Sequence, residues 1–270
     1  MSDRPGRKTI VFSHGNGFPA GTYRTLFEAW RAAGFDVQAV EKFGHDPRFA
    51  VTNNWPKLRD QLIAFVDDIG TPVWLVGHSL GGLLSLLAAS KRPDIASGLV
   101  LLDSPVITGW RAHSVQVAKT SRLIQRIGPG RISQRRRHTW PSREAVLAHF
   151  AAKHVFARWD PRVLADYVAA GFEEHDGQTQ LAFDREVETR IYNTLPHHLA
   201  SVLRRHPIRC PFGFIAGTQS EEMRRGGIEL SRRLAGERFS WIEGTHLYPM
   251  ERPDETAAKV LELIAGMGSH

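Results

Sequence analysis

The sequence predicts an α/β protein with a mostly parallel sheet of about six strands, flanked by helices and interrupted by a helical insertion. Three observations support this class. Short apolar runs of strand type alternate with amphipathic stretches of helix length. The runs are almost continuously hydrophobic, as in parallel strands buried on both faces. The alternation stops in residues 106–208, where no strong strand signal appears.

The alternating elements can be assigned in order along the chain. Glycine and proline mark two of the helix ends, at Gly34 and Pro93. The predicted strands are Thr9–Ser13, Phe35–Val40, Val73–Gly77, Ser97–Asp103, Phe212–Ala216 and Phe239–Glu243. The predicted helices are Tyr23–Ala33, Trp55–Ile69, Leu80–Lys91, Glu221–Leu234 and Asp254–Ala265.

The interruption predicts a second structural unit. Residues 106–208 form the predicted helical insertion, and residues 1–105 and 209–270 form the core around it. A segment this long is not expected to be a structureless loop. Its predicted helices are Ala112–Ile127, Arg143–Phe156, Pro161–Gly171 and Val187–Leu203.

Composition restricts the class of protein. No apolar run approaches the roughly 20 residues that span a bilayer, so no transmembrane segment is expected. The polar start at Met1–Lys8 lacks the apolar core of a secretory signal. The single cysteine, Cys210, excludes an internal disulfide and fits a reducing compartment. Together these features predict a cytoplasmic protein.

The net charge of +7 is concentrated in one segment. From Arg111 to Arg143 the chain carries nine arginines and lysines and no acidic residue. A solvated basic face is the favoured interpretation, and an anionic substrate or lipid surface is the alternative. A nucleic-acid contact is a third interpretation, but the rest of the chain is nearly balanced in charge, so no nucleic acid is expected.

The strongest motif is Gly77–Gly82 (GHSLGG), between a predicted strand and a predicted helix. A serine at such a sharp turn is exposed at the carboxyl edge of the sheet, and flanking glycines remove side chains that would collide. Ser79 is therefore a candidate nucleophile. The N–H of Leu80, at the start of the helix, can point at a developing oxyanion.

Two further loops follow other strands at the same edge. In His14–Pro19 (HGNGFP), Asn16 or Gly17 is the candidate for a second backbone donor to an oxyanion. In Gly244–Pro249 (GTHLYP), His246 is the candidate base for the serine proton. Of the 13 histidines, His78 is disfavoured as the neighbour of the serine, and His14 is expected to brace its loop.

These three motifs, in this order, resemble the α/β-hydrolase superfamily, in particular esterase- and lipase-like members that carry a helical cap. The resemblance covers Lys8–Pro105 and Arg209–Ala265, including the closing pattern G-T-H-x-x-P-x-E-R-P. It implies that Ser79, His246, Leu80 and the loop at Asn16 have the roles given above. It also implies that the insertion is a cap over the active site and that the sheet starts at the third strand of the family.

The acid of the expected Ser-His-acid triad has three candidate positions. The place where the family most often has it, three residues after Gly217, is occupied by Ser220. Asp103, at the end of the strand after the nucleophile helix, is favoured because some members of the family place their acid there. Glu221 and Glu222 are the alternatives. The histidine needs one of these carboxylates to fix its tautomer.

The predicted function is hydrolysis of a carboxylic ester, with an apolar or anionic acyl substrate, through an acyl-enzyme on Ser79. Thioesterase, carbon-carbon hydrolase and cofactor-free perhydrolase reactions use the same groups, and a non-catalytic binding protein is an alternative of another class. No metal or cofactor is required. Aromatic residues of the insertion either hold it together, which is favoured, or line an acyl pocket: Trp110, Phe150, Phe156, Trp159, Tyr167 and Phe172.

Overall fold

The computed structural model describes residues 8–107, 113–114, 116, 119 and 128–268. Its larger sheet has six strands, all parallel, in the order β2-β1-β3-β4-β8-β9. The predicted α/β class is confirmed, and each strand lies within one residue of its predicted bounds. The strands are β1 (Thr9–Ser13), β2 (Asp36–Ala39), β3 (Val73–His78), β4 (Ala96–Leu102), β8 (Phe212–Gly217) and β9 (Phe239–Ile242).

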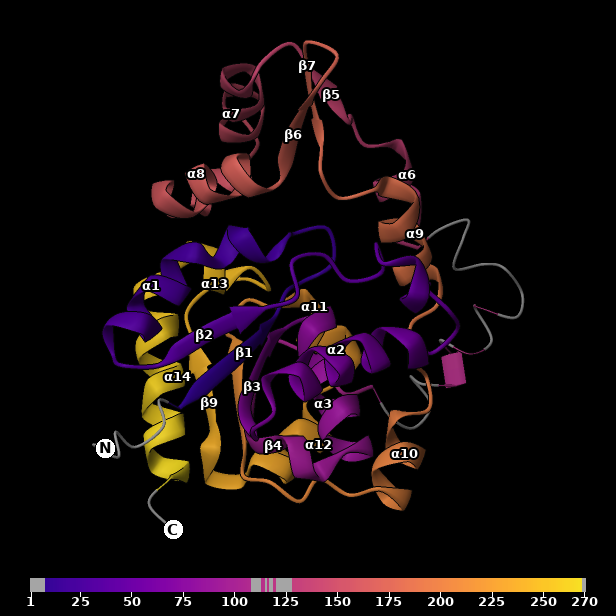
Figure 1. Ribbon diagram of the computed structural model, residues 1–270, viewed down its shortest axis with the longest axis vertical. Coiled ribbons are helices and arrows are strands. Elements are labelled where there is room, and N and C mark those ends of the chain that lie inside the picture. Colours follow the sequence, from indigo (N-terminus) through magenta and orange to yellow (C-terminus); the bar gives the residue numbers. More distant parts are fainter. Residues whose placement is uncertain (1–7, 108–112, 115, 117–118, 120–127, 269–270) are drawn as a thin grey trace.

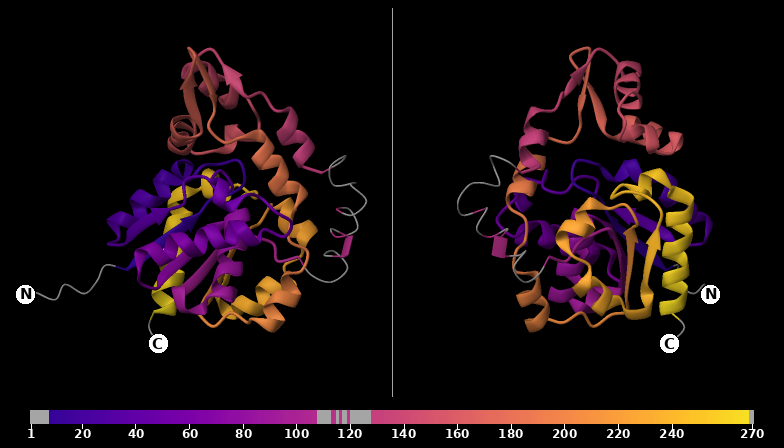
Figure 2. Two further views of the ribbon diagram at one scale, coloured as in Figure 1. Left: turned by 45° about the vertical axis from the view of Figure 1, so that its right-hand side comes forward. Right: turned by 180° about the vertical axis from the view of Figure 1, so that it is seen from behind.

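Helices cover both faces of this sheet (Figures 1 and 2). One face packs against α2, α3 and α12, and the other packs against α1 and α14. The helices of the core are α1 (Arg24–Ala32), α2 (Pro56–Ile69), α3 (Leu80–Lys91), α11 (Glu221–Gly226), α12 (Glu229–Ala235), α13 (Tyr248–Glu251) and α14 (Pro253–Met267). Short 3-10 turns, η1 (Ala20–Tyr23), η2 (Pro47–Phe49), η3 (Pro93–Ile95) and η5 (Gly236–Arg238), lie between them.

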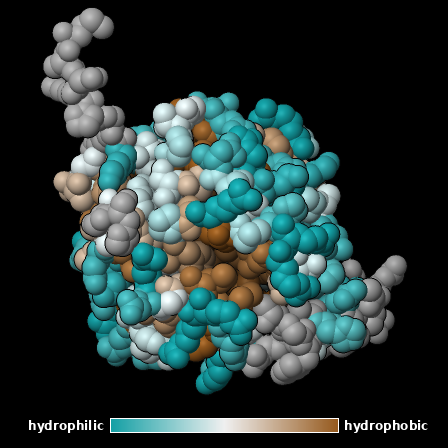
Figure 3. All heavy atoms as spheres, turned by 90° about the horizontal axis from the view of Figure 1, so that it is seen from below, coloured by the Kyte–Doolittle hydropathy of each residue, from teal (hydrophilic) through white to brown (hydrophobic). Residues whose placement is uncertain are grey.

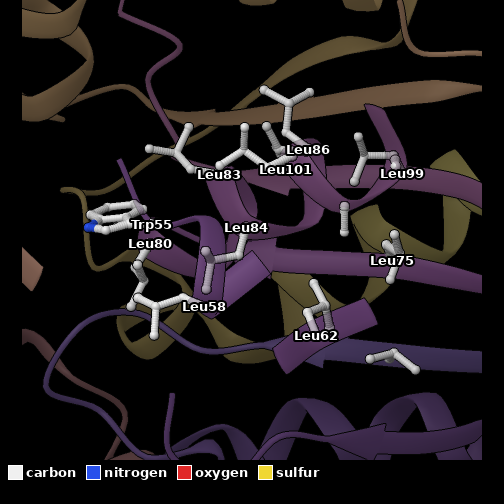
Figure 4. Close-up of a cluster of buried hydrophobic side chains, with 14 of the residues drawn as sticks. Trp55, Leu58, Leu62, Leu75, Leu80, Leu83, Leu84, Leu86, Leu99 and Leu101 are labelled. Carbon is white, nitrogen blue, oxygen red and sulfur yellow. The ribbon is translucent and has the colours of Figure 1, made fainter. Parts of the chain in front are cut away.

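Alternate strand residues supply the two halves of the hydrophobic core. Leu75 and Leu99 belong to the cluster under α2 and α3, whereas their neighbours Val76 and Val100 belong to the cluster under α1 and α14. Leucines from α2, α3, β3 and β4 gather with Trp55 in the first cluster (Figure 4). Burial on both sides of the sheet explains the continuous hydrophobicity of the strand sequences.

The register of the central strands sets where the site is built. His78 pairs with Leu102, and Leu102 pairs with Ile215, so β3, β4 and β8 end close to one level. Ser79 and Asp103, which follow β3 and β4 directly, therefore leave the sheet side by side at its carboxyl edge. The opposite end of the molecule, seen from below in Figure 3, shows apolar residues at its centre within a hydrophilic rim.

Two helices predicted as continuous are divided in the structure. The predicted helix over 221–234 is two helices, because Gly227 adopts a φ of +87° that ends α11. The predicted helix over 187–203 is also two, α9 (Arg185–Asn193) and α10 (Leu199–Arg205). Pro196 lies between them and cannot donate a backbone hydrogen bond to continue the first.

The insertion, residues 106–208, was predicted to be helical, but its described residues also form strands. It contains a three-stranded antiparallel sheet, in the order β5-β7-β6, that stands above the core beside α7 (Figure 1). Asp176 and Gly177 both have positive φ and connect β6 to β7 as a two-residue hairpin turn. Its described elements are α6 (Gly130–Arg135), β5 (Thr139–Trp140), α7 (Arg143–Ala151), η4 (Phe156–Arg158), α8 (Pro161–Ala170), β6 (Phe172–His175), β7 (Gln178–Leu181), α9 and α10.

Aromatic packing holds this part of the insertion together. Phe150, Tyr167 and Phe172 contact one another in edge-to-face or tilted pairs, with ring centroids 5.3 to 5.6 Å apart. Phe156 and Trp159 extend the cluster. The predicted helix over 112–127 and Trp110 fall mostly or wholly outside the described residues.

A buried carboxylate fastens the insertion to the core. Asp166 of α8 accepts hydrogen bonds from the Arg24 Nε atom at 2.7 Å and from the Thr25 hydroxyl at 2.8 Å, at the start of α1.

Within the described part of the chain, no helix has both the length and the apolar composition needed to cross a bilayer.

Candidate active site

Ser79 occupies a sharp turn between β3 and α3, with φ of 54° and ψ of −116°. This conformation is strained for a residue with a side chain. A Cβ atom on Gly77 would lie 2.4 Å from the Gly81 carbonyl carbon, and one on Gly81 would lie 1.9 Å from the Ser13 oxygen. Only glycine fits at both flanking positions, so the sequence motif follows from the turn.

Three side chains from separate loops form one hydrogen-bonded chain at the carboxyl edge of the sheet. The Ser79 hydroxyl lies 2.9 Å from His246 Nε2, and His246 Nδ1 lies 2.7 Å from Asp103 Oδ2. With the proton on Nδ1, His246 donates to Asp103 and accepts from Ser79. This is the tautomer that can take a proton from the serine.

Asp103 is fully buried and held by two further donors. The Gly217 N–H donates to Oδ1 at 2.7 Å, and the Ser220 hydroxyl donates to Oδ2 at 2.5 Å. The Ser220 oxygen also accepts from the Met223 N–H and caps α11. The sequence analysis assigned no function to Ser220. Its place at the position where the family most often has the acid could have indicated that it lies near the histidine.

The two alternative acids do not make this contact. Glu222 Oε2 is 3.9 Å from His246 Nδ1, on a half-exposed side chain, and Glu221 forms ion pairs with Arg224 and Arg225. Among the described residues, ligand atoms of Asp103, Glu222 and His246 lie within 4.8 Å of one another. A metal ion there would compete with the short His246–Asp103 hydrogen bond, so the donor set does not fit one.

The surroundings of His246 favour its charged form. Burial alone would lower the pKa of His246, but the hydrogen bond that its Nδ1 donates to Asp103, the charge of Asp103 and the nearby charge of Glu222 together raise this pKa above the ordinary value. An imidazolium formed during a reaction would therefore be stabilised.

The loop at Asn16 and Gly17 lies beside Ser79 and is fixed on two sides. His14 donates from Nδ1 to the Gly15 carbonyl and accepts the Phe43 N–H at Nε2, and burial lowers its pKa to about 4. The Asn16 amide donates to the Glu188 carbonyl of α9 at 3.1 Å.

Backbone donors at this point are available to a ligand. The N–H of Leu80, the first residue of α3, has no acceptor within the helix. No backbone hydrogen bond described outside helices and strands uses the N–H of Asn16 or Gly17. Gly17 has a φ of +81°, and a Cβ atom there would lie 2.8 Å from Glu188 Oε1.

His78 has a positioning contact that the sequence did not indicate. Its Nε2 donates to the His246 carbonyl at 2.9 Å, and its Nδ1 accepts from the Tyr23 hydroxyl at 2.7 Å. The same hydroxyl accepts the Gly15 N–H. Burial, together with the charge of His246, lowers the pKa of His78 to about 3, so His78 is neutral and links the histidine loop to the Asn16 loop.

Two cavities open at Ser79, with volumes of about 410 and about 640 Å³. The smaller has polar residues such as Arg158, Gln219 and Glu251 in its lining, and the larger is lined mainly by apolar residues, among them Trp55 and residues of α3 and α9. None of the five described aromatic residues proposed for an acyl pocket lines either cavity. They form the core of the insertion instead, as the favoured alternative predicted.

Comparison with known proteins gives the family. The model of the family described as "Alpha/beta hydrolase family" matches residues 10–259. Mouse monoglyceride lipase is 30% identical over 132 residues, which are 45% of this chain and 43% of the lipase. The chain thus aligns with less than half the length of this relative.

Two other similarities extend over nearly the whole chain. The uncharacterized hydrolase YugF of Bacillus subtilis is 26% identical over 274 aligned residues, covering 96% of this chain and 91% of YugF. The structure titled "Thioesterase Domain From Curacin Biosynthetic Pathway" superimposes with a TM-score of 0.75 at 17% identity, covering 95% of this chain and 92% of that one. At that identity the likeness shows the fold alone.

Proposed function

The chain belongs to the alpha/beta hydrolase family, and on this premise we propose that it is a serine hydrolase that cleaves carboxylic esters through an acyl-enzyme on Ser79. The single observation that carries the proposal is the hydrogen-bonded chain Ser79–His246–Asp103, with contacts of 2.9 and 2.7 Å. A hydroxyl, an imidazole and a buried carboxylate in this order are the groups of nucleophilic acyl transfer.

In the proposed reaction, His246 Nε2 takes the Ser79 proton while the serine oxygen attacks the ester carbonyl carbon. The tetrahedral intermediate collapses when His246 returns that proton to the alcohol, which leaves. Water then attacks the acyl-enzyme with His246 again as base, and the carboxylic acid and the free serine are restored. Asp103 holds the imidazole in the productive tautomer and stabilises its positive charge.

The backbone N–H groups of Leu80 and of Asn16 or Gly17 are proposed to bind the oxyanion. Leu80 begins a helix of 12 residues whose amino end favours negative charge. Removing one such donor typically costs about 10²- to 10³-fold in kcat, so the fixed position of the Asn16 loop matters for rate.

The insertion is proposed to act as a cap over the site. His154, Val155 and Arg158 from the insertion line the smaller cavity together with Ser79 and His246. In this role, walls from two parts of the chain would limit the access of water to the reacting groups and strengthen the electrostatic interactions there.

The proposal is tested by labelling with a fluorophosphonate probe and by hydrolysis of p-nitrophenyl esters of graded chain length. We expect one covalent adduct per chain and burst kinetics, both lost in Ser79→Ala. Ser97→Ala, at an exposed serine on β4, is the matched control and should retain both. A folded wild type that is neither labelled nor active would support a binding protein without catalysis.

A further inference from the structure

The two cavities at Ser79 meet at a shared boundary. Both are lined by Asn16, Ser79, Tyr192, Glu222 and His246. A molecule whose reacting carbonyl lies against Ser79 can therefore extend in two directions from the nucleophile.

The larger cavity, of about 640 Å³, has a predominantly apolar lining. Trp55, which directly precedes α2, Leu83 from α3 and Ile191 from α9 are almost fully buried, and Leu195 and Ile132 also line this wall. Apolar surface in a concave site favours an apolar ligand by removing its surface from water.

The smaller cavity, of about 410 Å³, has more polar side chains in its lining than the larger cavity and charges of both signs. Arg158 donates to Gln219 at 2.9 Å and forms an ion pair with Glu251 at 3.5 Å. Glu222 stands at the boundary of the two cavities, with its Oε2 3.9 Å from His246 Nδ1. Such a lining offers hydrogen-bond acceptors and donors beside the apolar side chains of Phe18, Val155 and Leu247.

The position of His246 decides which part of an ester occupies which cavity. The leaving alcohol receives its proton from His246 Nε2, so it must lie on the side of the histidine loop. Thr245 and Leu247, on either side of His246, line the smaller cavity only. Leu80 and Leu83, from the helix that follows the nucleophile, line the larger cavity only.

We propose that the substrate is an ester of an apolar, medium-chain or longer carboxylic acid with a compact polar alcohol, whose acyl chain lies in the larger cavity and whose alcohol lies in the smaller. This inference rests on the proposed function, because it assumes that Ser79 forms the acyl-enzyme. It adds the orientation and the chemical class of both halves of the substrate.

A pair of isomers tests the orientation. Ethyl octanoate and octyl acetate have the same atoms and differ only in the side of the ester that carries the long chain. Each buried methylene contributes up to about fourfold to binding. We therefore expect kcat/KM for ethyl octanoate to exceed that for octyl acetate by about tenfold or more. Equal values, or a preference for octyl acetate, would overturn the assignment.

Two matched substitutions test the placement. Leu195→Trp narrows the larger cavity and should lower kcat/KM for ethyl octanoate by about tenfold, which is more than it lowers kcat/KM for the short ester p-nitrophenyl acetate. Val155→Trp, the same kind of change at an exposed position of the smaller cavity, should keep the preference between the isomers. If Leu195→Trp does not fold, Ile132→Trp, at an exposed position of the larger cavity, replaces it. Retention of full ethyl octanoate activity in the narrowed variant would contradict the proposal.

The polar half of the substrate is tested with one added hydroxyl. Compared with ethyl octanoate, 2-hydroxyethyl octanoate should have a kcat/KM about two- to tenfold higher, the usual net effect of one hydrogen bond. A lower value would overturn the polar-alcohol assignment. Failure of both octanoates, with fluorophosphonate labelling and p-nitrophenyl acetate hydrolysis intact, would reject this inference alone. Absence of fluorophosphonate labelling in the folded wild-type protein would reject the proposed function itself.

Discussion

Replacing Asp103 by asparagine should nearly abolish ester hydrolysis, because one amide cannot serve the three donors that converge on this carboxylate. Gly217 N–H donates to Oδ1, while Ser220 and His246 donate to Oδ2. An asparagine has one acceptor oxygen and one NH2 group, and it is nearly identical in size. The substitution therefore tests charge and hydrogen bonding with little change in packing.

The two orientations of the amide set the magnitude. With its oxygen toward Gly217, the NH2 group faces His246 Nδ1, which must then accept, and the proton moves to Nε2, where it blocks the base. Loss of the correct tautomer costs about 10⁴-fold in kcat. With its oxygen toward His246, the NH2 group faces the buried Gly217 N–H, and this unpaired contact costs about 1–3 kcal/mol. We expect a loss of about 10²- to 10⁴-fold.

The assay is steady-state hydrolysis of p-nitrophenyl butyrate, with thermal unfolding to establish that the variant is folded. Glu222→Gln makes the same carboxylate-to-amide change 3.9 Å from the same nitrogen and should lose less than about tenfold. An Asp103→Asn variant within tenfold of wild type, together with a larger loss in Glu222→Gln, would refute the assignment of Asp103 and establish Glu222 in its place.

Three further outcomes are expected. Glu222→Gln should move the acidic limb of the kcat/KM pH profile to lower pH. The active form has neutral His246, and removing a negative neighbour lowers the pKa of His246. An unchanged acidic limb would contradict this prediction. Gly17→Ala should lower kcat about tenfold and lower the free energy of unfolding, measured with urea, by about 1–2 kcal/mol. The reason is that φ at this residue is +81° and the new Cβ atom would collide with Glu188. Wild-type values of both quantities would show that the loop adapts. Arg136→Leu should lower the free energy of unfolding by about 3 kcal/mol or more, because it removes the ion-pair partner that lies 2.9 Å from the buried Glu188. A change below about 0.5 kcal/mol would mean that this ion pair contributes nothing to stability.

The sequence predicted the parallel sheet well because each strand is buried on both faces. A run such as Val73–Val76 has apolar residues on both sides of the strand, and nothing in its neighbours competes with that pattern. The sharp turn at Ser79 was also predictable, since the collisions at Gly77 and Gly81 leave no other residue type possible. Local sterics of this kind can be read from a short motif.

The insertion was predicted less well because its strands are short and polar. The β6–β7 hairpin contains Glu173, Glu174 and Gln178, and its turn signal, the Asp176-Gly177 dipeptide, did not enter the sequence prediction. The contacts between the insertion and the site, such as the hydrogen bond from Asn16 to Glu188, could not be predicted from the sequence either.

Long-range pairing explains why the site could be predicted only in part. His78 reaches the His246 carbonyl across 168 residues of sequence, and Asn16 reaches Glu188 across 172. No spacing rule links residues so far apart in the chain. The sequence motifs located the groups that we propose to react, and folding determined which neighbours contact them.

The hydrogen bond from the Asn16 side chain to the α9 backbone has a consequence for protein engineering. Exchanging the insertion with that of another hydrolase, to transfer selectivity, would also exchange the surface on which the HGNGFP loop rests. A chimera that takes α9 from a donor protein without the matching loop would acquire a new chamber and a loosened catalytic centre. The two segments are one transplantable module, although 172 positions separate them along the polypeptide.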